Sequence, residues 1–207
     1  MLNFDLSKSF YIVIAEKDSF SGSRIGGLAP ERTCSTNEIA CKRCLKPLKY
    51  FLTLDLSETI PDIDKPMFSV YGCEEIDCLY DEKGTLTPPG VHIGIHNACP
   101  RQEAGSDNVE ANFEGRKLKF SRLENRAGSR SKLFGSPDFL NDTPEALSKR
   151  LAEGYRFVFQ FDEEDIIGKL NYKTAFFGFG TIYVLAKIDT NRAGIAFTNP
   201  QFYWESG

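Results

Sequence analysis

Residues 49–56 read KYFLTLDL, and this stretch decides which fold the sequence favours. Its three leucines fall at every second position, which is the period of a β-strand that turns one face to a core. A second run, MFSVY at residues 67–71, has the length and composition of another strand. The two segments are close enough in the chain to pair as a hairpin.

Most of the remaining pattern also favours strands, because aromatic and β-branched residues are frequent and alternate with polar ones. Further strands are expected at residues 11–15, 92–96, 117–123, 155–161, 176–188 and 195–203, the last interrupted by Asn199-Pro200. One helix is expected at 144–153, with Thr143 as N-cap and Gly154 after its end. No internal repeat of fixed period is visible. We therefore expect an α+β fold that is mostly β, with antiparallel sheets, one or two short helices and a four-cysteine zinc site, in a single domain over 1–207.

Two closely spaced cysteine pairs flank the predicted hairpin. Cys41 and Cys44 form a CxxC ahead of the first strand, and Cys73 and Cys78 form a CxxxxC directly after the second. If the strands pair, both loops fall at the same end of the hairpin. Zinc takes four thiolates at the corners of a tetrahedron, so the four cysteines predict a structural Zn²⁺ site without an open position.

Other readings of the cysteines have less support. A redox CxxC belongs in a thioredoxin-like βαβ context, which is absent, and disulfides need an oxidising compartment. The two remaining cysteines, Cys34 and Cys99, have no assigned role. On a strand, His92 and His96 share a face but stand about 13 Å apart, at ~3.3 Å per residue. That separation is too large for one ion, although a second metal site near Cys99 stays an alternative.

Charge is unevenly distributed along the chain, whose formal net charge is −4. The stretch 116–132 holds seven basic residues and one acidic residue, so it can meet RNA or an acidic partner, or simply be solvated. The acidic run 162–165 lacks the glycine and spacing of an EF-hand loop and fits a solvated turn. No signal peptide or membrane-spanning segment is visible, so a cytoplasmic location and no membrane contact are expected.

Several short motifs resemble known families. Residues 25–30 (IGGLAP), 47–52 (PLKYFL) and 68–73 (FSVYGC), together with the CxxC, are similar to the programmed-cell-death-protein-2 family. Residues 133–138 (LFGSPD) and 177–184 (FGFGTIYV) resemble YwqG-like proteins. The resemblance implies a mainly β domain of YwqG-like type with zinc at the four cysteines. It also implies work as a chaperone-like or immunity-type partner of another protein.

Function is therefore expected to be non-enzymatic protein binding by a zinc-stabilised module. The expected partner is another protein, with nucleic acid as a weaker option. The alternative is an RNA-processing or other enzyme that uses the basic segment 116–132 and the carboxylates 162–165. No GxSxG, HExxH or kinase pattern supports catalysis, and no catalytic residue is assigned.

Overall fold

The computed structural model describes residues 5–15, 22–27, 39–60, 63–64, 66–79, 86–97, 115–122, 130–140, 145–165, 180–191 and 194–206. The elements in chain order are β1 (Phe10–Ile14), β2 (Arg24–Ile25), β3 (Lys49–Asp55), the 3₁₀ turn η2 (Leu56–Glu58), β4 (Ile63–Asp64), β5 (Met67–Gly72), α1 (Ile76–Leu79), β6 (Val91–His96), β7 (Arg116–Ser121), β8 (Lys132–Leu133), α2 (Glu145–Ala152), β9 (Arg156–Asp162), β10 (Gly180–Asn191) and β11 (Gly194–Ser206).

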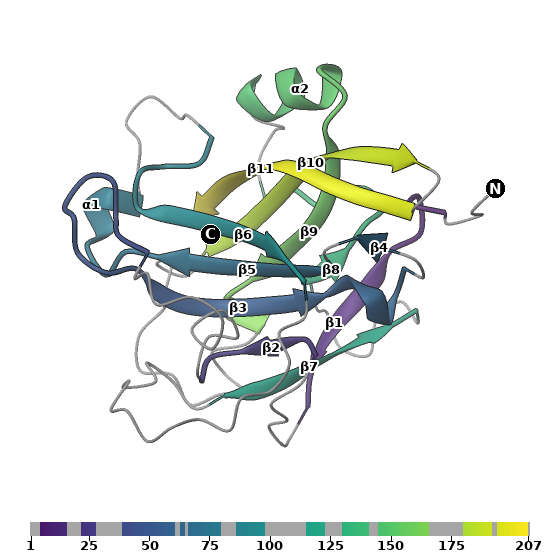
Figure 1. The fold of residues 1–207 in the computed structure, drawn as a ribbon, viewed down its shortest axis with the longest axis horizontal. Coiled ribbons are helices and arrows are strands. Elements are labelled where there is room, and N and C mark those ends of the chain that lie inside the picture. Colours follow the sequence, from purple (N-terminus) through teal and green to yellow (C-terminus); the bar gives the residue numbers. More distant parts are fainter. Residues whose placement is uncertain are drawn as a thin grey trace.

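The fold is mostly β, and the predicted α+β class was wrong. Of the described residues, 52% lie in strands and 13% in helices. The eleven strands form one sheet rather than several, in the order β4-β11-β10-β9-β8-β1-β7-β2-β3-β5-β6 (Figure 1). The helices are too short and too peripheral to make a layer of their own. The α+β class gave the short helices more weight than they have in the fold, where α2 covers only one end of the sheet.

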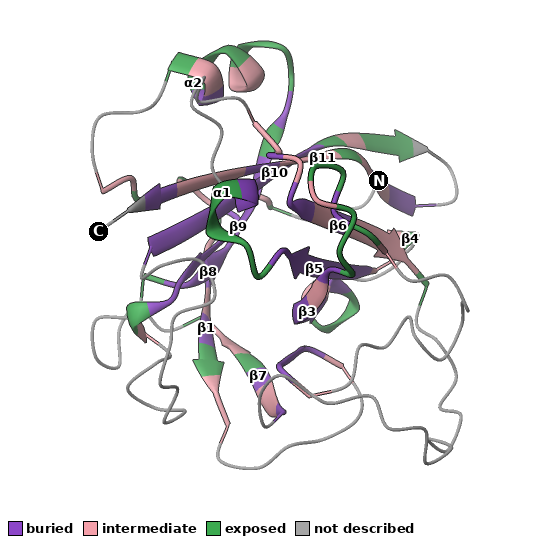
Figure 2. Cartoon of the chain, turned by 90° about the vertical axis from the view of Figure 1, so that its left-hand side faces the viewer, coloured by how far each residue is buried: buried purple, intermediate pink, exposed green. Residues whose placement is uncertain are grey.

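The sheet curls so that its inner face encloses the core. The ring of Phe68 on β5 meets the rings of Phe159 on β9 and Phe197 on β11, with centroids 6.3 and 5.4 Å apart. The curl brings the chain before β6 against β11, where the N–H of Thr87 donates to the carbonyl of Phe202 at 2.7 Å. Buried residues follow β3, β5, β9 and β10, while β1 and β7 also carry exposed positions (Figure 2).

The sheet consists of two halves with the same strand arrangement. One half has the order β1-β8-β9-β10-β11 and the other β7-β2-β3-β5-β6, and they meet where β1 pairs with β7. β1 precedes β2 in the chain but pairs with β8, and β7 precedes β8 but pairs with β2. Each half therefore receives its first strand from the other half, and β4 is added outside this pattern.

A side-chain clasp recurs at the same place in both halves. Ser23 Oγ accepts from the N–H of Asp55 at 2.8 Å, and Ser131 Oγ accepts from the N–H of Asp162 at 2.9 Å. Both serines are buried and directly precede the equivalent strands β2 and β8. Each clasp ties the start of a two-residue strand to the end of the long strand beside it.

A bulge also recurs. The register skips Phe51 in β3 and Val158 in β9. The carbonyls of these two residues accept the N–H groups of Gly26 and Phe134, each at 2.8 Å. Gly26 and Phe134 have φ values of 65° and 54°, so the same left-handed turn follows β2 and β8. Register, clasp, bulge and turn agree, and the sheet is an internal duplication that no fixed sequence period revealed.

The predicted alternation of β3 was incomplete. Every residue from Tyr50 to Leu54 is buried, because both faces of the strand are covered: Thr53, between two core leucines, bonds to the hydroxyls of Tyr50 and Ser69. The predicted strands at 11–15, 67–71 and 92–96 correspond to β1, β5 and β6. Strand β11 runs through Asn199, which has a φ of 49° and lies at a third bulge rather than at a strand end.

The predicted helix is present as α2. Its buried Leu147 packs with Tyr155 and Leu185, and Gly154 follows it with a φ of 88°, as expected of a residue after a helix end. The proposed N-cap Thr143 lies outside the described residues. Among the described residues, no helix is both long and apolar enough to cross a bilayer.

The clasps generate a test of the duplication. Ser23→Ala and Ser131→Ala should each lower the free energy of unfolding by about 1–3 kcal/mol, because each leaves a largely buried N–H without its acceptor. Ser148→Ala, on the exposed side of α2, should change it by less than ~0.5 kcal/mol. Urea unfolding followed by fluorescence measures all three, and a buried-serine variant as stable as the control would contradict the equivalence.

Candidate metal centre

The two cysteine loops lie at the same end of the β3–β5 hairpin, as predicted. β3 and β5 are antiparallel, and Lys49 at the start of β3 pairs with Gly72 at the end of β5. Cys44 precedes this point and Cys73 follows it, so the hairpin register alone brings the loops together. Cys78 returns to the same place on the single turn α1.

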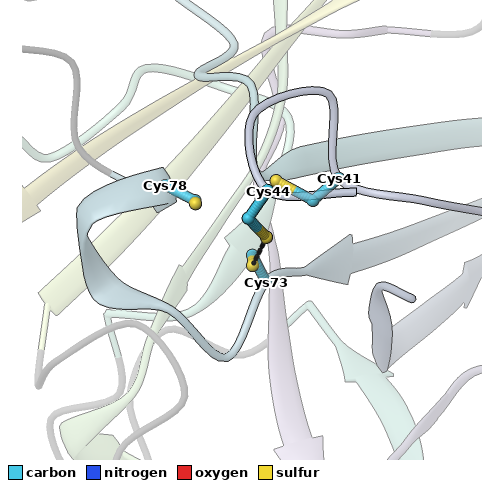
Figure 3. A group of neighbouring side chains, drawn as sticks. All are labelled: Cys41, Cys44, Cys73 and Cys78. Atoms are coloured by element: carbon cyan, nitrogen blue, oxygen red, sulfur yellow. Dashed lines mark hydrogen bonds between the residues drawn. The ribbon is translucent and has the colours of Figure 1, made fainter. Parts of the chain in front are cut away.

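The four sulfurs form one compact cluster. The Sγ atoms of Cys41, Cys44, Cys73 and Cys78 all lie within 4.8 Å of one another, and those of Cys44 and Cys73 are 3.5 Å apart (Figure 3). Three of the four cysteines are buried and Cys44 is half-buried. This grouping of four soft donors can hold a metal ion.

The CxxC forms a tight turn. The N–H of Leu45 donates to the carbonyl of Cys41 at 3.0 Å, and the N–H of Cys41 donates to the carbonyl of Lys46 at 2.8 Å. The N–H of Arg43 points at the Cys41 sulfur at 3.4 Å. The turn therefore fixes both sulfurs toward the cluster and supplies a donor that favours thiolate.

Gly90 ties the second loop to the hairpin, and the sequence reasoning missed it. The carbonyl of Gly90 accepts the N–H of Cys73 at 2.8 Å, and its own N–H donates to the carbonyl of Cys78 at 2.9 Å. A Cβ added at Gly90 would stand 2.5 Å from that carbonyl oxygen. Only glycine allows this approach, and the Pro88-Pro89-Gly90 turn signal ahead of a strand was the available sequence clue.

The surroundings shift the pKa of three thiols in different directions. Burial opposes ionisation of Cys41, but the N–H groups of Cys44 and Arg43 bring its pKa down to about 7. Burial raises the pKa of Cys73 to about 12 and that of Cys78 to about 11. A bound dication favours thiolate at every ligand, so its charge would offset the desolvation of the two more basic sulfurs.

The loops also attract each other through charge. Three contacts join them: Lys46 with the carboxylate of Glu75, Lys49 with that of Glu74 at 3.6 Å, and the Arg43 guanidinium with the main-chain carbonyl of Asp77. The first loop supplies the cations and the second the acceptors. Since these groups are largely exposed, the contacts orient the loops more than they stabilise them.

The second half of the sheet closes the equivalent end differently. There α2 precedes β9, just as the CxxC turn precedes β3. Leu147 and Leu151 of α2 pack with Tyr155 and Leu185 in a separate apolar cluster. In the first half, the CxxC turn with its part of the sulfur cluster stands at the corresponding point of the chain, directly before β3.

The two histidines do not join the cysteine cluster. His96 Nε2 lies 2.9 Å from Ser69 Oγ, and His92 packs its ring against that of Tyr71 at 6.0 Å. Among the described residues, the cysteine cluster is the one group that can hold a metal ion. Cys34 and Cys99 lie outside the described residues.

The acidic run 162–165 is not the solvated turn that its composition favours. Asp162 and Glu163 are buried. Burial raises the pKa of Asp162, whose carboxylate accepts the hydroxyl of Thr181 at 3.2 Å. Asp165 Oδ2 accepts the N–H groups of Arg130 and Ser131 at 2.7 and 2.9 Å. Asp165 thus binds main-chain N–H groups ahead of β8, whereas Asp162 accepts hydrogen bonds from Thr181 on β10 and from the N–H of Glu164.

The basic stretch 116–132 is divided by its position in the sheet. Lys119 on β7 and Arg122 after it are exposed. Lys132 on β8 is buried and pairs with the carboxylate of Asp138 at 2.5 Å. Residues 123–129 lie outside the described part of the chain. The stretch is therefore not one continuous basic face over the residues that can be described.

In comparisons with known proteins, no family model, no curated protein and no solved structure matches the chain. The chemistry of the cysteine cluster and its surroundings is therefore what bears on the function.

The cluster predicts metal binding with a defined stoichiometry. Reduced protein should bind one Co²⁺ per chain, with the visible absorption of a tetrahedral thiolate site. Cys73→Ser should weaken this binding strongly because it removes a buried ligand. Cys34→Ser is the matched control and should bind like the unaltered chain. Equal loss in both variants, measured by optical titration, would show that the ligand set is different.

Proposed function

We propose that the chain is a zinc-stabilised, non-enzymatic module that binds another protein. The observation that carries this proposal is the closed set of four cysteine sulfurs, three of them buried. Zinc with four thiolates has no position left for water or substrate, so its role is structural. The ion replaces, at one end of the sheet, the apolar contacts that α2 makes at the other.

Zinc is the ion that this donor set fits best. Four thiolates in a tetrahedral group select zinc or iron–sulfur chemistry, and a mononuclear S₄ site formed by two short loops is typical of structural zinc. The bond from the Arg43 N–H to sulfur supports the thiolate form of Cys41. The resemblance to the programmed-cell-death-protein-2 and YwqG-like families points the same way, toward a zinc domain that accompanies another protein.

The enzymatic alternative has weaker support in the described residues. It needs the carboxylates 162–165 to face a substrate, whereas Asp165 accepts main-chain N–H groups and Asp162 is buried against Thr181. Of the basic stretch, Lys119 and Arg122 are exposed and can contribute to a surface of positive charge. A nucleic-acid partner bound there would show strong salt dependence.

Capture experiments at two salt concentrations separate the two functions. Tagged, zinc-loaded protein should retain a protein partner at both 0.1 and about 0.5 M NaCl, where exposed charge interactions are largely screened. The double variant Lys119→Glu/Arg122→Glu should capture the same partner after nuclease treatment. If RNA is recovered instead, and the double variant releases it, the processing function replaces the binding module. Metal analysis of the same sample should give one zinc per chain.

A further inference from the structure

Two of the three large apolar side chains that are exposed in the described residues lie on the cysteine loops. Leu45 follows directly after Cys44 and is 77% exposed, and Ile76 precedes Cys78 and is 52% exposed. The third is Val13 on β1, at 43%. Single exposed apolar residues are common, but two on facing loops of one metal centre form a local concentration.

Leu45 also has an unfavourable backbone conformation. Its φ is 63°, a left-handed value that glycine adopts freely and that a branched side chain resists. Three other described residues besides glycine share this feature, and each has compensation. Phe134 is fully buried, Thr87 Oγ1 accepts the N–H of Phe202 at 3.0 Å, and Asn199 is a residue type that tolerates the conformation. Leu45 lacks both burial and a polar side chain.

The tight turn itself explains why the left-handed conformation is needed, but not why leucine is there. The hydrogen bonds that shape the turn come from main-chain atoms of Cys41, Leu45 and Lys46, so glycine would make them equally well. A leucine at this position exposes apolar surface and retains strain. Strained, exposed residues that the fold does not require are typical of binding sites.

Four of the charges around these two residues are paired within the protein. Lys46 pairs with Glu75, and these residues directly follow Leu45 and directly precede Ile76. Lys49 pairs with Glu74 beside them. The other charged residues of the loops, Lys42, Arg43 and Asp77, are exposed and together add a net charge of only +1, so the rim around the apolar tips is nearly neutral. Such a rim favours a partner surface of low net charge, because a charged partner would have to compete with these pairs.

We propose that Leu45 and Ile76 are the anchors of the protein-binding surface, and that they insert into an apolar pocket of low net charge on a folded partner protein. This inference rests on the proposed binding function and names the surface that performs it. The metal centre holds the two loops together, so it positions the anchors relative to each other. Binding is carried by apolar contact and is insensitive to salt.

Stability measurements on the purified, metal-loaded chain test the first part. Leu45→Gly and Leu45→Asn should keep the metal and melt at the same temperature as the unaltered protein or higher, because both residues tolerate the left-handed conformation. Val13→Asn is the control for removal of an exposed apolar residue from a strand. A drop of several degrees for both Leu45 variants would mean that the side chain supports the fold, and would overturn the proposal.

Site-specific photo-crosslinking tests the second part. A diazirine amino acid at position 45 or 76 should give the same protein adduct whether photolysis is carried out at low salt or in about 1 M NaCl, where charge interactions are screened, and the amino acid at position 13 should not. The partner identified by mass spectrometry is then purified. Its affinity should fall by about tenfold or more for Leu45→Asn and for Ile76→Ser, and stay unchanged for Val13→Asn.

The outcomes distinguish this inference from the proposed function. A partner that binds Leu45→Asn and Ile76→Ser as tightly as the unaltered chain overturns the anchor assignment but leaves a binding module. Absence of any adduct at positions 45 and 76 likewise overturns the assignment. Adducts that form on photolysis at low salt but not on photolysis at high salt contradict the apolar mode. A chain that holds one zinc yet captures no protein by any face contradicts the proposed function itself.

Discussion

The pairing of β1 with β7 holds the two halves of this sheet together, and the rest of the structure depends on it. Each of these strands also completes the half to which it does not belong in sequence: the N–H of Ile12 donates to the carbonyl of Ser131, and that of Leu118 to the carbonyl of Ser23, both at 2.8 Å. Neither half can form its first strand pair without the other. The duplication therefore produces one continuous sheet with one core, rather than two small sheets that would each bury too little surface.

Within this shared frame, the two halves solve the same end-closing problem by different chemistry. The chain leads to β3 through residues 26–48 and to β9 through residues 134–155, so the two connections are of similar length. The second contains α2, whose leucines cover the start of β9, and the first contains the CxxC turn with two of the four clustered sulfurs. A metal bound by close-spaced ligands can stabilise loops that have few apolar residues to bury. It also leaves those loops free to present side chains outward, as Leu45 and Ile76 do.

The buried charged residues also follow from the frame. Lys132 and Arg24 occupy equivalent positions on β8 and β2, and both are buried. Lys132 is neutralised by Asp138. Asp165 binds main-chain N–H groups that precede β8. A two-residue strand has little cohesion of its own, so side-chain contacts of this kind fix its ends. Members of the basic stretch 116–132 and of the acidic run 162–165, which in sequence look suited to binding a ligand, are in this way bonded to other parts of the fold.

The sequence by itself determined most of the longer strands, the helix α2 and the four cysteines that cluster, but not the two-residue strands β2, β4 and β8. Each depends on short-range spacing: alternation in residues 49–56, the Gly154 signal, and the CxxC and CxxxxC pairs beside one hairpin. The sequence also contains the similar segments Ser23-Arg24-Ile25 and Ser131-Lys132-Leu133, which lie at the start of the equivalent strands. One match of three residues is too short to define a repeat. Only the tertiary structure decided that β1 crosses to the other half, that Asp162 is buried, and that Leu45 is exposed in a strained turn. The reason is physical: local patterns choose a strand or a turn, whereas strand partners and burial depend on residues far away in the chain.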